Sequence, residues 1–180
     1  MADTQTKSAE IPEEMKDFLQ RLASLSGLTI EEVSSLYEQA KKGATLAEMF
    51  NIPPESLAAG YTLAYNLFNA GQYNDAETMF RALCQYDNTN PKHWLGLGCT
   101  LQKLGLFREA SFCFAHAADL GHPPKIKALF LLAQCCATIE DYPTARQVLE
   151  LAFAADPGSD SVELEYLNFA KDLMAKLPKD

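Results

Sequence analysis

Apolar side chains recur at the spacing of an α-helix along most of this chain. Between Pro12 and Gly27 they mark one face of an amphipathic helix, at Met15, Phe18, Leu19, Leu22 and Leu25. Two capping-box patterns follow, from Thr29 to Glu32 and from Thr45 to Glu48, each ahead of another apolar group. We therefore expect N-terminal helices in residues 12–55, after a polar and disordered segment in residues 1–11.

The pattern that follows is repetitive. Residues 71–80 are echoed by residues 105–114, a shift of 34, and then by residues 140–149, a further shift of 35. An aromatic residue, an alanine and a large apolar residue keep their places in each copy. This period and order are typical of the tetratricopeptide repeat, a helical hairpin. Three repeats are therefore predicted in residues 56–157, with one residue inserted near Gly121-His122-Pro123-Pro124.

Small and large residues are distributed as hairpin packing requires. Small residues hold the positions of close helix approach, namely Ala64, Ala76, Gly98, Ala110, Ala133 and Ala145. Large residues fill the spaces between them, namely Leu67, Phe80, Leu101, Phe114 and Leu149. A last apolar stripe in residues 158–180 predicts a C-terminal capping helix, which repeat arrays require. The predicted fold is all-α, with three tetratricopeptide-like hairpins stacked as a short solenoid between N-terminal helices and this cap.

The first helices of the repeats present an apolar face. Helical spacing places on one side the candidate peptide-binding residues Tyr61, Tyr65, Phe68, Leu95, Cys99, Gln102 and Phe130. A contiguous apolar surface usually marks a binding site, and tyrosine suits it because its ring is apolar and its tip polar. The alternative is that the N-terminal helices cover the three aromatic residues. Lys92, Lys103 and Lys127 lie near the same side, where they could hold peptide carbonyls or simply be solvated.

Composition excludes several partners. The formal net charge of −9 repels nucleic acids and anionic membranes, and no stretch of 18 apolar residues or signal-peptide pattern is present, so membrane insertion is not expected. The five cysteines are an odd number and lie within apolar helical patterns, which argues against a disulfide framework and favours a reducing compartment. We expect a soluble, cytoplasmic protein.

No motif for catalysis or cofactor binding emerges. Gly96 and Gly98 suggest a dinucleotide fingerprint, but Leu101 stands where its third glycine belongs. Cys113 and His116 share a helical face, yet a structural zinc site needs a second pair of ligands. Apolar helices also do not provide the positive, exposed environment of a cysteine nucleophile. The sequence therefore predicts no enzyme, no metal and no cofactor.

Three segments together resemble a known family. Residues 60–68, 71–84 and 95–98 are similar to the class II chaperones of bacterial type III secretion, and the likeness extends over roughly residues 28–156. The third repeat and everything after Pro157 match less well. The resemblance implies a cytoplasmic chaperone whose concave groove holds an extended segment of a hydrophobic translocator. Tyr61, Tyr65 and Phe68 would line that groove, with Leu95 and Phe130 continuing it.

The resemblance also implies a homodimer that involves the N-terminal helices. Phe18, Leu19 and Leu22 are the candidate dimer contacts; the alternative is that the first helix folds back on its own chain. Two other binding functions stay open. One is a scaffold that clamps an acidic carboxyl-terminal peptide, although such clamps use lysine and asparagine where Tyr61 and Tyr65 stand. The other is a structural assembly subunit that binds one folded component of a secretion apparatus.

Overall fold

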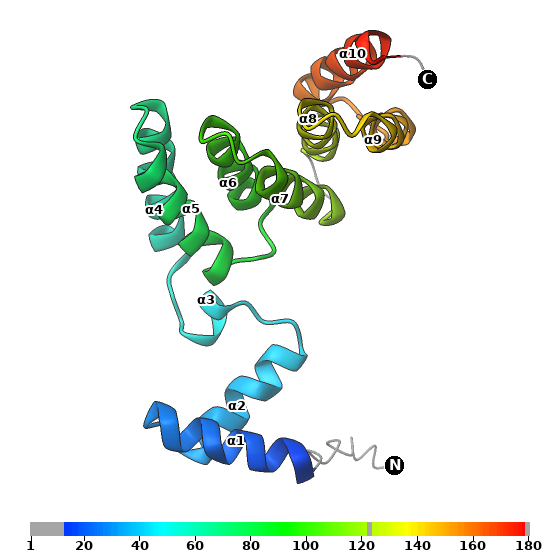
Figure 1. The fold of residues 1–180 in the computed structure, drawn as a ribbon. Coiled ribbons are helices and arrows are strands. Elements are labelled where there is room, and N and C mark those ends of the chain that lie inside the picture. Colours follow the sequence, from blue (N-terminus) through cyan, green and yellow to red (C-terminus); the bar gives the residue numbers. More distant parts are fainter. Residues whose placement is uncertain (1–12, 122–123, 179–180) are drawn as a thin grey trace. The chain divides into compact units, whose positions relative to one another are not determined.

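The computed structural model of the protein describes residues 13–121 and 124–178, and every regular element in them is an α-helix (Figure 1). The ten helices are α1 (Glu13–Ser26), α2 (Ile30–Lys41), α3 (Leu46–Met49), α4 (Pro54–Asn69), α5 (Tyr73–Tyr86), α6 (Pro91–Lys103), α7 (Phe107–Asp119), α8 (Lys125–Thr138), α9 (Tyr142–Ala154) and α10 (Ser161–Lys176). The predicted all-α fold is confirmed. The expected disorder of residues 1–11, and His122 and Pro123 of the expected insertion, lie outside the described residues.

The chain divides into two compact units, one ending at Ala44 and the other beginning at Thr45. In the first unit α1 packs on α2. Gly27 ends α1 with a φ of 75°. The expected capping box starts α2: the Thr29 hydroxyl accepts a hydrogen bond from the Glu32 N–H, and the Glu32 carboxylate accepts one from the Thr29 N–H. Leu19 is almost fully buried, whereas Phe18 and Leu22 on the same helix are exposed.

The second unit contains the three hairpins, α4 with α5, α6 with α7, and α8 with α9, together with α3 and α10. Each hairpin also packs against the next one, through α5 on α6 and α7 on α8. The last helix, α10, lies on α8 and α9 and thereby covers the open end of the stack. The short helix α3 makes its contacts with α5 of this unit.

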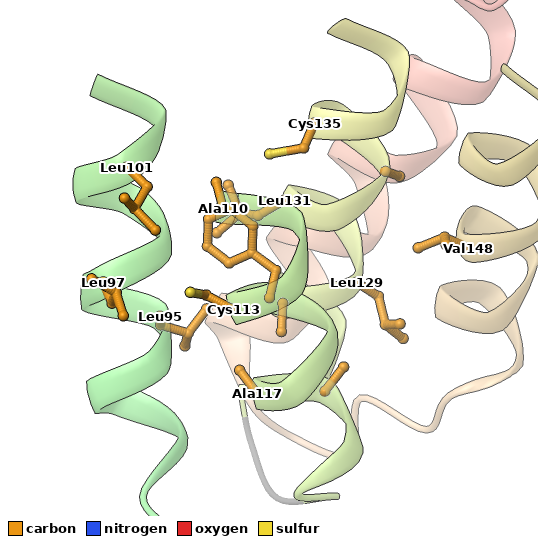
Figure 2. Packing of buried hydrophobic residues seen from close by; sticks show 14 of the residues in the cluster. Leu95, Leu97, Leu101, Ala110, Cys113, Ala117, Leu129, Leu131, Cys135 and Val148 are labelled. Carbon is orange, nitrogen blue, oxygen red and sulfur yellow. The ribbon is translucent and has the colours of Figure 1, made fainter. Parts of the chain in front are cut away.

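The core of this unit follows the predicted alternation of small and large residues. The five alanines predicted at positions of close helix approach are completely buried, and Gly98 is buried as well. Phe80, Leu101, Phe114 and Leu149 fill the spaces between helices at 1% exposure or less. Figure 2 shows how side chains of α6, α7 and α8 meet in this core. A Cβ atom added at Gly98 would lie only 2.5 Å from the Phe114 ring, so the absence of a side chain there is what lets α6 and α7 approach.

The turns inside the hairpins share one backbone conformation. Gly71 and Gly105 adopt φ values of 77° and 78° between the two helices of the first and second hairpins. Glu140 holds the equivalent place in the third hairpin with a φ of 64°. Because a Cβ atom makes this left-handed region unfavourable, Glu140 carries backbone strain that its glycine counterparts avoid.

The amino end of α8 is capped from a distant part of the chain. The buried carboxylate of Glu163, on α10, accepts hydrogen bonds from the backbone N–H groups of Ile126 (2.6 Å) and Lys127 (3.2 Å). The N-cap residue itself, Pro124, makes no side-chain hydrogen bond to the helix. Glu163 therefore fixes α10 against α8 with two charge-assisted bonds.

Candidate functional site

The repeat unit contains a cleft of about 570 Å³ bounded mainly by the first helices of the hairpins. Its lining residues are Tyr61, Tyr65, Phe68, Phe80, Lys92, Leu95, Gly96, Cys99, Pro124, Lys127, Asp160 and Val162. Aromatic and aliphatic side chains predominate, which is the usual make-up of a site that buries apolar groups of a ligand. We call this space the aromatic cleft.

One wall of the cleft is an ordered group of aromatic rings. The rings of Tyr61 and Tyr65 stack with centroids 6.5 Å apart and planes 10° from parallel. Tyr61 also meets the buried ring of Phe80 edge to face at 5.8 Å, and Phe68 meets Tyr73 in the same manner at 5.6 Å. Tyr65 remains 51% exposed, so a large ring is held in place but left accessible. Such a wall can bury a ligand's apolar side chains at little cost in conformational entropy.

The polar groups of the cleft have defined surroundings. Burial raises the pKa of the Tyr61 hydroxyl, and Tyr65 and Cys99 add to this effect, so the hydroxyl stays neutral and can donate a hydrogen bond. Burial also raises the pKa of the Cys99 thiol, which the nearby charges of Lys127 and Lys103 partly offset. The ammonium group of Lys127 lies 5.3 Å from the centre of the Tyr166 ring, a cation–π contact with α10.

Five of the seven residues predicted for peptide binding lie together in this cleft: Tyr61, Tyr65, Phe68, Leu95 and Cys99. Gln102 lies outside the cleft lining, where its Nε2 group contacts Gln134 Oε1 at 3.4 Å and Cys135 Sγ at 3.2 Å. Phe130 also lies outside it and packs instead against the rings of Tyr166 and Phe169 at 5.6 and 6.0 Å. The face of α8 that carries Phe130 is thus partly occupied by the closing helix.

Several lining residues were not predicted as site residues. Asp160 and Val162 come from the start of α10, which the sequence indicated only as a cap, and Pro124 belongs to the segment of the predicted insertion. Gly96 also lines the cleft, and a Cβ atom added there would overlap the ring of Phe80, so a larger residue at this position would disturb the aromatic wall. A signal for Gly96 was present in the sequence, since it stands two residues before Gly98 in a helix whose other residues are larger. No local signal pointed to Asp160 or Val162.

A second, smaller hollow of about 360 Å³ lies among α5, α6 and α7. Its lining includes Trp94, Phe112 and Arg81. Trp94 is held by a bond from its indole N–H to the Asn88 carbonyl (2.9 Å) and packs on the His116 ring with centroids 4.3 Å apart, while Phe112 is 66% exposed. None of the predicted binding residues lies there.

The cysteines are free thiols, and four of them, Cys84, Cys113, Cys135 and Cys136, are buried. Burial raises the pKa of Cys84 to about 12 and that of Cys113 and Cys135 to about 11, so these thiols are protonated at neutral pH. Among the residues that the structure describes, no group of three or more histidine, cysteine or acidic side chains could hold a metal ion. In that same part of the chain, none of the helices has the length and apolar character needed to cross a bilayer.

Comparison with known proteins places these features in a family. The family model described as anaphase-promoting complex, cyclosome, subunit 3 matches residues 69–152, from the end of α4 into α9. The chaperone protein SicA of Salmonella typhimurium is 33% identical over 116 residues, which are 64% of this chain and 70% of SicA.

Solved structures agree with that similarity. The Yersinia enterocolitica type III secretion translocator chaperone SycD superposes with a TM-score of 0.67 at 24% identity, covering 74% of this chain and 98% of SycD. SycD in complex with a peptide of the translocator YopD gives a TM-score of 0.56 at 25% identity, with coverage of 68% and 97%. An alternative dimer of SycD gives 0.54 at 27% identity, with coverage of 70% and 98%.

Proposed function

Since the chain belongs to the family of type III secretion translocator chaperones, we propose that it holds an extended segment of a hydrophobic translocator in the aromatic cleft. The protein is a chaperone of such translocators and not an enzyme. Bound in this way, the translocator would remain soluble and separate from its partners before export. The observation that carries the proposal is the pre-ordered aromatic wall formed by the exposed Tyr65 with the partly buried Tyr61 and Phe68.

The physical basis of capture is burial of apolar surface against rings that are already ordered. A side chain of the translocator that enters the cleft would contact Tyr65 and Phe68 on one side and Leu95 and Cys99 on the other. Ordering these groups costs little on binding, because packing against Phe80 and Tyr73 already restricts the Tyr61 and Phe68 rings. Fully burying one leucine-sized side chain contributes roughly 1.5–3 kcal/mol.

We place the chaperone in the bacterial cytoplasm as a homodimer. Five free thiols are compatible with a reducing compartment. In the first unit, α1 exposes Phe18 and Leu22, which a second copy of the chain could bury. Leu19 is 2% exposed in the single chain, so its part in the dimer would be to support the helix rather than to contact the partner.

The test is recovery of cargo from the native cytoplasm by the tagged wild-type chain and by a Tyr61→Ala/Tyr65→Ala/Phe68→Ala variant that still unfolds cooperatively. Bound proteins are identified by mass spectrometry, and limited proteolysis of the complex then defines the protected segment. The expected result is a translocator that is recovered by the wild type only and protected over a short extended stretch. Recovery of one folded, water-soluble protein by both chains would instead indicate a structural assembly subunit.

Single substitutions give the strength of the contact. Tyr65→Ala or Phe68→Ala is expected to weaken binding of the protected segment by about 1–3 kcal/mol, because aromatic anchors dominate such interfaces. Phe112→Ala is the matched control, since this exposed ring lies on α7 outside the aromatic cleft. Equal affinities for all three variants, measured by isothermal titration calorimetry, would remove the cleft from the proposal.

A further inference from the structure

Two lysines of the aromatic cleft occupy the same position in successive repeats. Lys92 lies in the first turn of α6 and Lys127 in the first turn of α8, a shift of 35 residues that matches the repeat spacing. Each stands three residues before a large apolar side chain of the same helix face, Leu95 or Phe130. We refer to Lys92 and Lys127 as the lysine pair. The first repeat has Ala58 at this position, so the charge is confined to the second and third hairpins.

The lysine pair has no anionic partner. Within residues 13–121 and 124–178, the ion pairs join other residues, and neither Lys92 nor Lys127 takes part in one. Other described lysines, such as Lys42 and Lys125, also take part in no ion pair, so what distinguishes the lysine pair is its place in the lining of the aromatic cleft. Lys127 is nevertheless held at the cleft, because its ammonium group contacts the Tyr166 ring. Two cations therefore line an apolar cleft in a protein whose net charge is negative.

The other charged and polar groups at this end of the cleft are already engaged. Asp160 is its only lining carboxylate among the described residues, and its Oδ1 atom accepts bonds from the N–H groups of Val162 (2.8 Å) and Glu163 (3.3 Å) as the cap of α10. The N–H of Lys92 donates to Asn90, and the N–H of Lys127 donates to Glu163. The backbone at these helix starts is thus satisfied, and what remains for a ligand is the side-chain charge of the lysine pair.

We propose that the aromatic cleft selects a translocator segment in which an aspartate or glutamate accompanies the apolar anchor residue, with the carboxylate placed against Lys92 and Lys127. This inference rests on the proposed function and specifies the chemistry of the segment. Tyr61, Tyr65, Phe68, Leu95 and Cys99 bind the apolar side chain, and the lysine pair determines which flanking residue is accepted. Charge complementarity of this kind contributes to specificity more than to affinity.

The test uses the full chain and a mixture of short synthetic peptides that carry one fixed leucine and random residues elsewhere. All peptides are acetylated and amidated, so a carboxylate can come only from a side chain. Peptides that co-elute with the protein in size-exclusion chromatography are sequenced by mass spectrometry. With the wild type, we expect aspartate and glutamate to be enriched about three- to tenfold at a fixed distance from the leucine, the range that two partly exposed ion pairs produce.

Three variants of equal folding stability sharpen the result. Lys92→Gln/Lys127→Gln should lose the acidic preference but keep the apolar one, and Lys92→Glu/Lys127→Glu should prefer lysine and arginine instead. Lys42→Gln/Lys171→Gln changes the net charge equally at exposed positions outside the cleft and should behave as the wild type. Lys92→Gln alone serves if the double variants unfold, because this side chain is exposed. At about 1 M salt, where the Debye length is about 3 Å, the preference should fall in the wild type as well.

The possible results distinguish the role of the lysine pair from the proposed function of the aromatic cleft. If the wild type enriches aliphatic residues but takes acidic and neutral neighbours equally, the role of the lysine pair is refuted and the cleft still binds peptides. The same conclusion follows if the lysine-pair variants keep the acidic preference. If no peptide is enriched, or if a Tyr65→Ala/Phe68→Ala variant recovers the same peptides as the wild type, the proposed function itself fails.

Discussion

Replacing either of two helical glycines by alanine should change stability in opposite directions. Gly60 lies within α4 and Gly98 within α6. In a helix interior, alanine is favoured over glycine by about 1 kcal/mol, so both substitutions begin with the same gain. At Gly60 the new Cβ atom would meet only the end of the Leu83 side chain, at 3.4 Å, a contact that a small rotation relieves. We therefore expect Gly60→Ala to stabilise the protein by up to about 1 kcal/mol.

At Gly98 the gain in helix propensity is outweighed by steric overlap with the Phe114 ring. The new Cβ atom would lie 2.5, 2.8 and 2.8 Å from three atoms of the Phe114 ring, which is completely buried and cannot move aside. Overpacking of a core costs about 1–3 kcal/mol, and three simultaneous overlaps place this case at the upper end. After the helix gain is subtracted, Gly98→Ala should destabilise the protein by about 2 kcal/mol.

Urea denaturation followed by far-ultraviolet circular dichroism measures both free energies of unfolding. Adding Phe114→Leu to Gly98→Ala should recover part of the loss, because the smaller side chain removes the overlapping ring edge, and the double-mutant cycle should show favourable coupling. If Gly98→Ala stabilises the protein as Gly60→Ala does, then α6 and α7 do not approach at this residue, and the packing of the second hairpin is not as described.

Three further predictions concern other parts of the repeat unit. Glu140→Gly should stabilise the protein by about 1 kcal/mol in urea denaturation, because glycine adopts the φ of 64° without strain; an unchanged midpoint would contradict it. Glu163→Ala should cost about 1–3 kcal/mol and speed amide hydrogen exchange at the start of α8, since one buried and one partly buried N–H group lose their acceptor. Unaltered exchange there would refute the cap. The pKa of Cys84 is raised to about 12, so iodoacetamide at pH 8 should leave this thiol unmodified in the native protein and alkylate it in denaturant. Mass spectrometry measures the modification, and rapid alkylation of the native protein would mean that the thiol is accessible.

Much of the fold was predictable because the repeat places the same residue types at the same contacts. The period of about 34 residues located Ala64, Ala76 and Gly98 at positions that the structure shows to be buried. Both predicted capping boxes form, because their bonds join residues only three apart and depend on nothing else in the chain. Patterns that are local or repeated can be found from the sequence.

The candidate site was only partly predictable, because some of its residues come from contacts that are neither local nor repeated. Five of the seven predicted binding residues share the aromatic cleft, since helical spacing places them on one face of α4 or α6 and the repeat brings those two faces together. The contribution of Asp160 depends on where α10 docks, which no periodicity encodes. Phe130 keeps the expected helix face but meets Tyr166, because the stack ends at the third hairpin and the closing helix takes the place of a fourth.

The bond between Glu163 and α8 also sets an order of events for a growing chain. The first amides of α8 are synthesised 36 and 37 residues before the carboxylate that satisfies them, so the third hairpin cannot complete its own hydrogen bonding when it first emerges. By contrast, α6 has its cap, Asn90, directly before it. The second hairpin can therefore mature during translation, whereas the third waits for α10. A shortened chain, or one engineered to carry a fourth repeat, would need a new acceptor for these amides.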